Sequence, residues 1–355
     1  MEGEAIRRRV FILFAICLLF VLVIGAVAIG YVRYLNDPPL TTPAIVSDAG
    51  LWIEGDELHI EVKNGESEAS VGERLENARV IKSRYVWQLI SRYEDDFIKA
   101  GTYRIALPAS QWEIFSQLVE GRQVQVRVTI PEGATLKKTS RILAEARICE
   151  VDDFLEAAQR KEILDQYKVL GSSMEGYLYP ETYLFPLNYP AEQVVKRMID
   201  TFFTRIAEID PAIMQYSPQE IHEKVILASI IEREYRVADE AAIMAGVFTN
   251  RLKIGMPLQS CATVEYIITE IQGKPHPEVL FNRDTEIDDP YNTYRRRGFP
   301  PGPISAPGET ALKAAFMPAA TDYLYFRLVD ARAGRHYFSK TLDDHIQAGA
   351  IYVKW

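Results

Sequence analysis

The chain has 355 residues, of which 48% are hydrophobic and 25% charged, a composition typical of a folded protein with two or three domains. Its 49 acidic residues outnumber its 40 basic residues, so the formal net charge is -9. A negative chain is repelled by nucleic-acid phosphates and anionic lipids, and we therefore expect no nucleic-acid partner.

An uncharged apolar run near the amino terminus, residues 10–32, is the strongest single signal. At about 1.5 Å per residue in a helix, it is long enough to cross a hydrocarbon core of about 30 Å. A cleaved signal peptide is the alternative, but its apolar core would span only about 7 to 15 residues. Arg7, Arg8 and Arg9 precede the run, which predicts a transmembrane helix with residues 1–9 in the cytoplasm and the remaining chain outside.

The segment after the span, residues 33–47, contains three prolines between residues 36 and 43. Proline-rich segments are extended and semi-rigid. We therefore expect a stalk that lifts the remaining chain off the membrane.

Residues 48–165 contain an internal repeat at an offset of 68 residues. The pattern predicts a strand, a glycine turn and two helices in each copy, and the first strands alternate as half-buried strands do. The copies align at 62–65 with 130–133 and at 78–80 with 146–148. Such a unit is similar to a LysM-type glycan-binding module, mainly in the second copy, although chance similarity between two ordinary helices is the alternative.

Residues 166–355 form the expected second domain. Two segments, 174–186 and 288–308, are too rich in Pro, Gly and Asn for regular elements and too aromatic for disordered linkers, so they are expected to line a site. The periodicity predicts helices at 190–207, 218–235, 238–253, 260–271 and 309–316 and strands at 326–330 and 336–340. The expected fold class is α+β, with one amino-terminal transmembrane helix, the LysM-like α/β region and a mixed α+β domain.

Residues that ligate metals or form disulfides are few. Cys17 lies in the span, while Cys149 and Cys261 could form a disulfide in an oxidising compartment or remain separate thiols. The five histidines have no metal-ligand spacing, since His222-Glu223 lacks the second histidine of a zinc motif. We expect neither a metal nor another cofactor.

Two carboxylates close the stretch LASIIEREY. Residues two apart in a helix point to different sides, so Glu232 and Glu234 cannot form a carboxylate pair. Glu232 follows an apolar run, where burial would raise its pKa and let it donate a proton, and Ser229 lies one turn before it. Glu234 has Arg233 and Arg236 nearby and is interpreted as a member of a surface ion pair. Solvated positions at a helix end are the alternative for both carboxylates.

The aromatic loops carry residue types that suit a sugar, because tyrosine rings offer apolar faces while amides and hydroxyls offer directional hydrogen bonds. Packing is the alternative for most of these tyrosines. A glycosidase would need either a second carboxylate across the cleft or a substrate that supplies the second group itself. Glu175, Glu181 and Asp289 are the candidates for a second carboxylate.

Ordered motifs along essentially the whole chain resemble the MltG (YceG-like) endolytic murein transglycosylase family. They are EGYLYPETY, LASIIERE, NRLKIGMPLQ, ATVEY, PYNTY, GFPPGPISAPG and HYFSKTLDDH. In this family's A-S-I-x-E-x-E motif, the catalytic acid falls on Glu232. One departure is Cys261-Ala262, where many members have Asp-Pro. Either that Asp is not needed for the chemistry, or this protein is slower or differently tuned.

The resemblance implies cleavage of the β-1,4 bond between N-acetylmuramic acid and N-acetylglucosamine in nascent peptidoglycan, with formation of 1,6-anhydro ends. It implies a single-pass protein of the bacterial cytoplasmic membrane with peptidoglycan synthases as candidate partners. The expected substrate contacts are Glu175, Tyr177, Ser229, Gln259, Thr263, Tyr266, Asn292, Thr293 and Tyr294. A muramidase-type hydrolase and a non-catalytic, membrane-tethered peptidoglycan-binding scaffold are the alternatives.

Overall fold

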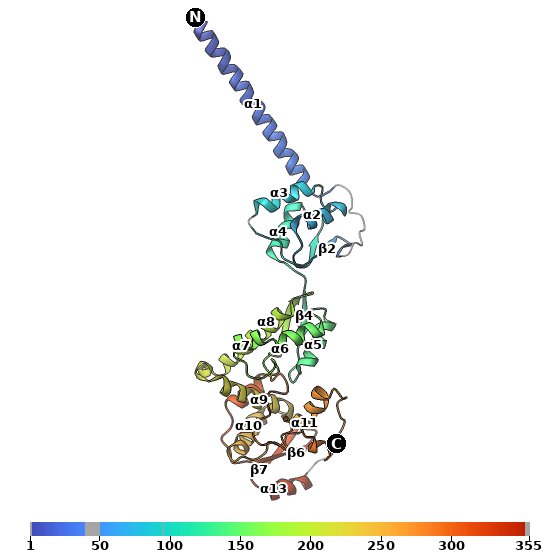
Figure 1. Cartoon of the computed structure of the whole chain (residues 1–355), viewed down its shortest axis with the longest axis vertical. Coiled ribbons are helices and arrows are strands. Elements are labelled where there is room, and N and C mark those ends of the chain that lie inside the picture. The colour runs from blue at the N-terminus through green and yellow to red at the C-terminus, as the bar shows by residue number, and fades with distance from the viewer. Residues whose placement is uncertain (1, 40–49, 95, 352–355) are drawn as a thin grey trace. The chain divides into compact units, whose positions relative to one another are not determined.

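The computed structural model describes residues 2–39, 50–94 and 96–351, and the chain divides into two compact units (Figure 1). Unit 1 comprises residues 1–125 with 186–188, and unit 2 comprises residues 126–185 with 189–355.

Unit 1 begins with helix α1 (Glu2–Asn36), whose segment Phe11–Asn36 contains an 18-residue window with a mean hydropathy of 3.3 and no buried residue. It is the one helix in the described residues that is long and apolar enough to cross a membrane. The helix ends at Asn36, shortly before Pro38 and Pro39, because proline disfavours helical backbone in the residue before it and donates no hydrogen bond. Residues 33–36 of the expected stalk are therefore helical, and residues 40–47 lie outside the described part.

The globular part of unit 1 packs three helices against a three-stranded antiparallel sheet of order β1-β2-β3. The strands are β1 (Leu51–Glu54), β2 (Glu57–Val62) and β3 (Gly101–Ala106), and the helices are α2 (Glu68–Asn77), α3 (Arg84–Tyr93) and α4 (Gln111–Glu120). Alternate residues of β2 face the core, where the rings of Trp87 and Phe115 lie edge to face at 5.1 Å.

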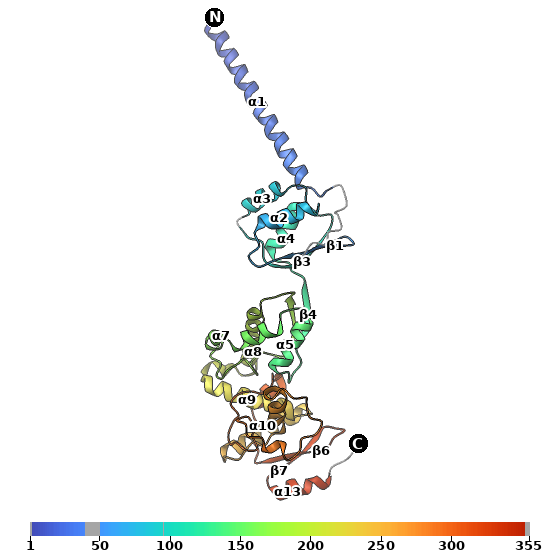
Figure 2. The same ribbon diagram turned by 45° about the vertical axis from the view of Figure 1, so that its right-hand side comes forward.

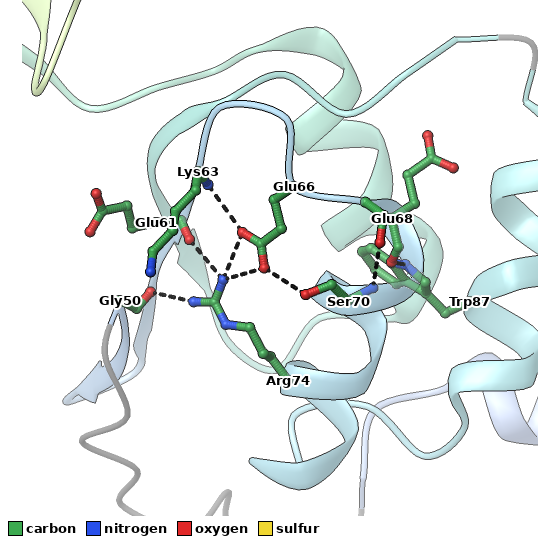
Figure 3. Close-up of polar contacts among 9 residues, drawn as sticks. Gly50, Glu61, Lys63, Glu66, Glu68, Ser70, Arg74 and Trp87 are labelled. Atoms are coloured by element: carbon green, nitrogen blue, oxygen red, sulfur yellow. Dashed lines mark hydrogen bonds and ion pairs between the residues drawn. The ribbon is translucent and has the colours of Figure 1, made fainter.

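A polar cluster ties the β2–α2 turn to α2. The Arg74 guanidinium donates to the Glu66 carboxylate at 2.9 Å and to the carbonyls of Gly50 and Glu61 at 3.0 Å, as Figure 3 shows. Burial alone would raise the pKa of Glu66, but hydrogen bonds from Arg74, Lys63 and Ser70 hold it below its ordinary value. The cluster therefore stabilises this turn with groups of unit 1 alone.

Unit 2 is mixed α+β and has one continuous hydrophobic core. Its helices are α5 (Leu136–Glu145), α6 (Val151–Gln159), α7 (Lys161–Gln166), α8 (Ala191–Ile209), α9 (Pro218–Glu234), α10 (Ala238–Lys253), α11 (Cys261–Tyr266), α12 (Glu309–Phe316) and α13 (Leu342–Gln347). Its strand pairs are β4 (Gln125–Thr129) with β5 (Thr182–Pro186) and β6 (Tyr325–Asp330) with β7 (Arg335–Ser339). The helices and closing strand pair predicted beyond residue 190 are present, with α11 continuing into a π-helical turn, Ile267–Ile271.

The expected repeat is present in the local structure. In both copies a strand leads through a glycine with positive φ, Gly65 (+76°) or Gly133 (+71°), into a helix that a Ser or Thr caps. Each of these helices is followed by an arginine with positive φ, Arg79 (+56°) or Arg147 (+57°). The copies nevertheless lie in different units, since the division falls at residue 125 and not at 165, and the second copy packs into the core of unit 2. A LysM assignment stays a prediction.

The cysteines are separate thiols: Cys17, Cys149 and Cys261 are all free. Cys149 and Cys261 were expected either to form a disulfide or to remain separate thiols, and the structure shows separate thiols. Burial, with the nearby charges of Asp153 and Glu150, raises the pKa of Cys149 to about 12, which makes it an inert packing residue.

Candidate active site

Helix α9 carries both candidate acids at its carboxyl end. It begins with a capping box, in which Ser217 and Glu220 satisfy each other's backbone N–H groups, and Pro218 occupies its first turn. Residues 225–231 are all buried, so this part of the helix is surrounded by other segments on every face. A polar residue directly after this run is consequently placed at the edge of the core and is only partly hydrated.

Glu232 is half-buried and accepts a hydrogen bond from the Gly308 N–H at 2.9 Å. Burial raises the pKa of Glu232 to about 7; the Gly308 N–H opposes the rise, and the negative charge of Glu132 adds to it. A carboxyl group with this pKa is protonated in a large fraction of molecules near neutral pH. Glu232 therefore has the electrostatics of a general acid.

Glu132 is the carboxylate that lies beside Glu232. Its place next to the turn glycine is the one feature of the sequence that marks it. Gly308 makes room for it, because a side chain at Gly308 would overlap the Glu132 carboxylate. Two backbone hydrogen bonds of 2.8 Å, Gly133 N–H to Ala306 and Ala306 N–H to Ala134, bind the turn to the 306–308 loop. The second repeat copy is thus built into the site.

Glu234 differs from its expected role. It belongs to no ion pair in the described part of the chain, although Arg233 is its neighbour, because Arg233 pairs with Glu265 at 2.8 Å. The Glu234 carboxylate instead accepts a hydrogen bond from the Ser260 hydroxyl at 2.5 Å. Burial raises the pKa of Glu234, and the Ser260 bond only partly opposes the rise. The interpretation as a surface ion-pair member is wrong because the carboxylate turns inward at the helix end.

Glu234 lines a cavity of about 520 Å³, which we call the Glu234 cavity. Gln259, Cys261 and Tyr294 line it as well, and the Cys261 thiol lies 3.1 Å from the Tyr294 hydroxyl. Cys261 therefore contributes a thiol to the lining of this cavity, at the position where the family resemblance led us to expect Asp. Burial raises the pKa of Cys261, so the thiol stays neutral and does not replace that charge.

A second cavity of about 580 Å³ borders the Glu232 side. Its lining includes Gly133, which packs against Glu232, and Arg233, which also lines the Glu234 cavity. Most of its charged residues are basic: Lys137, Lys138, Arg141, Arg233 and Lys274 against Glu270. We call it the cationic cavity. Its charge suits an anionic part of a ligand.

Six of the nine residues expected to contact substrate are buried: Glu175, Tyr177, Ser229, Thr263, Asn292 and Thr293. The five other than Glu175 form hydrogen bonds that hold neighbouring helices and loops. The Ser229 hydroxyl accepts from the Ile304 N–H at 3.0 Å, and the Ser229 carbonyl accepts from the Ser305 hydroxyl at 3.1 Å. These bonds hold the loop that supplies Gly308. None of the surface of Ser229 is exposed in the folded chain, and the substrate contact expected for it stays a prediction.

The other buried members hold loops in the same way. Asn292 donates to the carbonyls of Thr285 and Ile287, and the hydroxyls of Thr263 and Thr293 lie 2.9 Å apart. The Tyr177 hydroxyl pairs with His222 at 2.8 Å. Sequence patterns select polar residues in loops but do not separate those that bind a ligand from those that bind the loop itself.

Glu175 is a buried carboxylate at the first turn of α5, where the Leu136 N–H donates to both of its oxygens at 3.1–3.2 Å. Burial raises the pKa of Glu175 to about 8. Of the other two proposed second carboxylates, Glu181 pairs with Arg205 at 2.9 Å and Asp289 caps the Tyr291 N–H at 2.8 Å. The structure pairs none of the three with Glu232, whose carboxylate neighbour is Glu132.

Gln259, Tyr266 and Tyr294 remain accessible among the expected contacts. Gln259 has a positive φ of 54° and its N–H donates to the Thr293 carbonyl at 3.1 Å, which turns its side chain toward the Glu234 cavity. The Tyr266 ring lies 5.1 Å from that of Tyr291.

Residues 60–350 match the YceG-like family. The chain belongs to this family, as the sequence motifs indicated. It is 32% identical over 315 residues to the endolytic murein transglycosylase of Bacillus subtilis (strain 168), covering 83% of this chain and 85% of that protein. It is 28% identical over 323 residues to the protein of the same name from Streptococcus pneumoniae serotype 2, covering 82% of this chain but 58% of that longer protein.

A solved relative has a similar fold. The crystal structure of a YceG-like protein from Listeria monocytogenes, determined at 2.6 Å, matches with a TM-score of 0.55 and 30% sequence identity. The match covers 82% of this chain and 98% of that one. The YceG-like fold thus includes both units.

Proposed function

We propose that the protein is an endolytic peptidoglycan lytic transglycosylase that cuts the β-1,4 bond between N-acetylmuramic acid and N-acetylglucosamine in nascent strands. The observation that carries the proposal is the Glu232 carboxyl group, whose pKa of about 7 results from burial at the end of α9, in a chain of the YceG-like family. The names of its relatives from Bacillus subtilis and Streptococcus pneumoniae support the same activity.

In the proposed reaction, protonated Glu232 donates its proton to the glycosidic oxygen as the bond to C1 of the muramyl sugar breaks. The 2-acetamido group of that sugar stabilises the developing positive charge. Glu232, now ionised, accepts the proton of the C6 hydroxyl as its oxygen bonds to C1, which regenerates the acid and forms the 1,6-anhydro end. The substrate supplies the nucleophile, so one carboxyl group is sufficient, unlike in glycosidases with two carboxylates.

Glu234 is the second candidate for the acid. Its pKa is also raised by burial, and unlike Glu232 it lines the Glu234 cavity directly. The two carboxylates point to different sides of the helix end, so a single glycosidic oxygen is reached by one of them and not by both. Substituting each carboxylate separately decides between them.

A muramidase-type hydrolase is the second candidate function, and Glu132 is the observation that favours it. An exposed carboxylate beside the acid could activate a water molecule, which would then attack C1 and leave a reducing end. The products of the two reactions differ by one water molecule.

Further features support a peptidoglycan substrate at the membrane. The cationic cavity suits the carboxylates of peptide stems. Gln259 and Tyr294, which line the Glu234 cavity, and the partly exposed Tyr266 are the proposed contacts to sugar rings and hydroxyls. Helix α1 supports a single-pass anchor in the cytoplasmic membrane with its amino terminus inside, and synthases of the same strands are the proposed partners.

The test is mass spectrometry of glycans released from uncrosslinked peptidoglycan by the full chain in detergent. We expect anhydro products, lighter by one water than hydrolytic fragments, and a loss of at least about 100-fold in rate for Glu232→Gln, as for removal of a general acid. Glu208→Gln, an exposed carboxylate on α8, is the matched control.

The outcomes separate the alternatives. Loss of activity in Glu234→Gln but not in Glu232→Gln would identify Glu234 as the catalytic acid and place the reaction in the Glu234 cavity. Hydrated reducing ends would identify a hydrolase. An inactive wild-type chain, on a substrate that a control enzyme cleaves, would favour the non-catalytic scaffold.

A further inference from the structure

Unit 1 exposes a set of large apolar side chains on α3, α4 and the segment between α3 and β3. Tyr85, Leu89 and Tyr93 lie four residues apart on α3 and are 66%, 53% and 80% exposed. Phe97 is 80% exposed, and Trp112 on α4 is 38% exposed with its ring 6.1 Å from that of Tyr93. We call these five residues the aromatic face.

The residues of the aromatic face do not belong to the hydrophobic core of unit 1. Helix α3 already fills the interior of unit 1 with Val86, Trp87 and Ile90, which lie on its other side. The exposed residues at 85, 89 and 93 recur at helical spacing, so they form one continuous stripe. Contiguous apolar surface on a folded domain marks a contact with a partner or a membrane.

The aromatic face adjoins the end of the apolar helix α1. Three hydrogen bonds join the last turn of α1 to the body of unit 1: Lys82 Nζ to the Tyr34 carbonyl at 2.9 Å, Gln111 Nε2 to the Leu35 carbonyl at 2.5 Å, and the Trp112 N–H to Asn36 Oδ1 at 3.0 Å. Trp112 itself belongs to both the aromatic face and this joint. Figures 1 and 2 both show α3 at the end of unit 1 from which α1 leaves.

The length of α1 determines where residues 34–36, which join α1 to the body of unit 1, lie relative to the bilayer. A hydrocarbon core of about 30 Å takes up about 20 residues of helix, and the headgroup layer on each side adds about 5–7 Å, or three to five residues. If the span starts at Phe11, it leaves the hydrocarbon near Tyr31, and residues 34–36 lie in the headgroup layer. Side chains bonded to residues 34–36 must then reach the same layer.

We propose that the aromatic face of unit 1 lies in the interfacial layer of the outer leaflet, so that unit 1 is seated on the bilayer and is not held above it. This rests on the membrane anchor of the proposed function. Tyrosine and tryptophan favour this layer because their rings are apolar and their polar groups stay hydrated. Arg84 on α3 is already paired with Glu73 and Glu76, so zwitterionic lipid is a sufficient partner.

The test is lipid quenching of tryptophan fluorescence, with the full chain in phosphatidylcholine vesicles carrying a nitroxide near the top of the acyl chain. Flotation with the vesicles is measured first, because it reports on the anchor alone. In a Trp112→Phe background, Tyr93→Trp adds a tryptophan to the aromatic face, while Trp52, the buried Trp87 and Trp355 provide the baseline common to both chains. Interfacial residence predicts that the nitroxide lowers the added fluorescence at least about twofold.

The second arm weakens the aromatic face without touching unit 2. Leu89→Ser together with Phe97→Ser in the Tyr93→Trp chain should reduce the quenching. Because both side chains are exposed, these substitutions should leave the thermal unfolding midpoint unchanged. A chain that floats but shows no quenching at position 93 would overturn the proposal and assign the aromatic face to a protein partner or a second copy. A chain that does not float would overturn the anchor and this proposal together. Neither readout depends on glycan cleavage, so the activity is tested independently.

Discussion

The two strand-helix-helix copies have the same local structure but end in different surroundings. In the first copy, the turn at Gly65 closes on its own helix through the Glu66–Arg74 cluster of unit 1 (Figure 3). In the second copy, the turn at Gly133 forms no such pair with any residue that the structure describes, and it bonds instead to the loop at 306–308. The residue before each glycine is Asn64 in one copy and Glu132 in the other.

This difference shows how one local pattern serves two purposes. A turn that satisfies its own polar groups stabilises a domain. A turn whose backbone groups hydrogen-bond to another loop can hold a side chain beside a distant residue. Here it holds Glu132 beside Glu232, 100 positions later in the chain. Substitutions at matched positions of the two copies should therefore separate effects on stability from effects on activity.

Among the substitutions that compare the two copies, the largest effect is expected from Gly308→Ala, which affects the contact between the second copy and the 306–308 loop. The new methyl group would overlap the Glu132 carboxylate and displace it or the loop that donates to Glu232. Misplacement by about 1 Å at a reacting group costs up to about 100-fold, so we expect a loss of about 10- to 100-fold in kcat/KM for glycan release. Full activity with unchanged stability would show that the loop tolerates the change and that Glu132 needs no fixed position.

The next effect is on stability and belongs to the first copy. Glu66→Gln removes the charge that Arg74 pairs with, and a partly buried pair of this kind is worth about 2 kcal/mol. The pKa of Glu66 is lowered in the folded state, so its stabilisation is present above the ordinary Glu pKa and is lost as the pH falls. Denaturant unfolding of unit 1, followed by near-ultraviolet circular dichroism at pH 7 and pH 3, should show a loss of stability at pH 7 that is smaller at pH 3.

Gly65→Ala and Gly133→Ala compare the two turns directly. Both glycines have φ above +70°, so each alanine should cost about 1 kcal/mol of stability through backbone strain. A side chain at Gly65 meets nothing within 4 Å, whereas one at Gly133 meets the Glu232 Cγ at 3.8 Å. The contact at Gly133 is an ordinary van der Waals contact, so the expected loss comes from strain that shifts the turn carrying Glu132. Glycan release should fall in Gly133→Ala and stay unchanged in Gly65→Ala; equal activities would contradict a role for the second turn in the site.

The smallest effect is a shift in pH dependence. Glu132→Gln removes a negative charge that raises the pKa of Glu232 from its ordinary value toward about 7, while the burial that contributes most remains. An acid with a lower pKa loses its proton at lower pH, so the basic limb of the kcat/KM profile should move to lower pH by less than about one unit. Glu208→Gln is the control, and a shift to higher pH would contradict the assignment.

The extent of prediction from sequence differs between elements and contacts. The apolar span, the repeat, α8–α10 and the closing strand pair follow from periodicity and capping signals, which act over a few residues. The inward turn of Glu234 could not be predicted in this way, because it depends on Ser260, which another segment brings to the helix end. The position of Glu132 beside Glu232 could not be predicted for the same reason, since the sequence shows only an acidic residue in a turn.

The substrate-contact set illustrates the same limit. Tyr177, Ser229 and Asn292 are polar residues in or beside aromatic loops, which is also where ligand contacts occur. In the folded chain their hydrogen bonds are already satisfied by His222, by Ile304 and by the carbonyls of Thr285 and Ile287. Buried polar groups must be paired, and sequence alone does not say whether the partner is a ligand or the loop itself.

By itself, the sequence determined the family, the membrane-length helix, the doubled strand-helix-helix unit and the carboxylate at the end of a buried run. These depend on composition, spacing and short-range hydrogen bonds. Only the tertiary structure decided that the two copies join different units, that Glu132 and Gly308 lie beside Glu232, and that Glu234 lines a cavity. The physical reason is that burial and charge coupling, which set the pKa of each carboxylate, depend on distances between segments far apart in the chain.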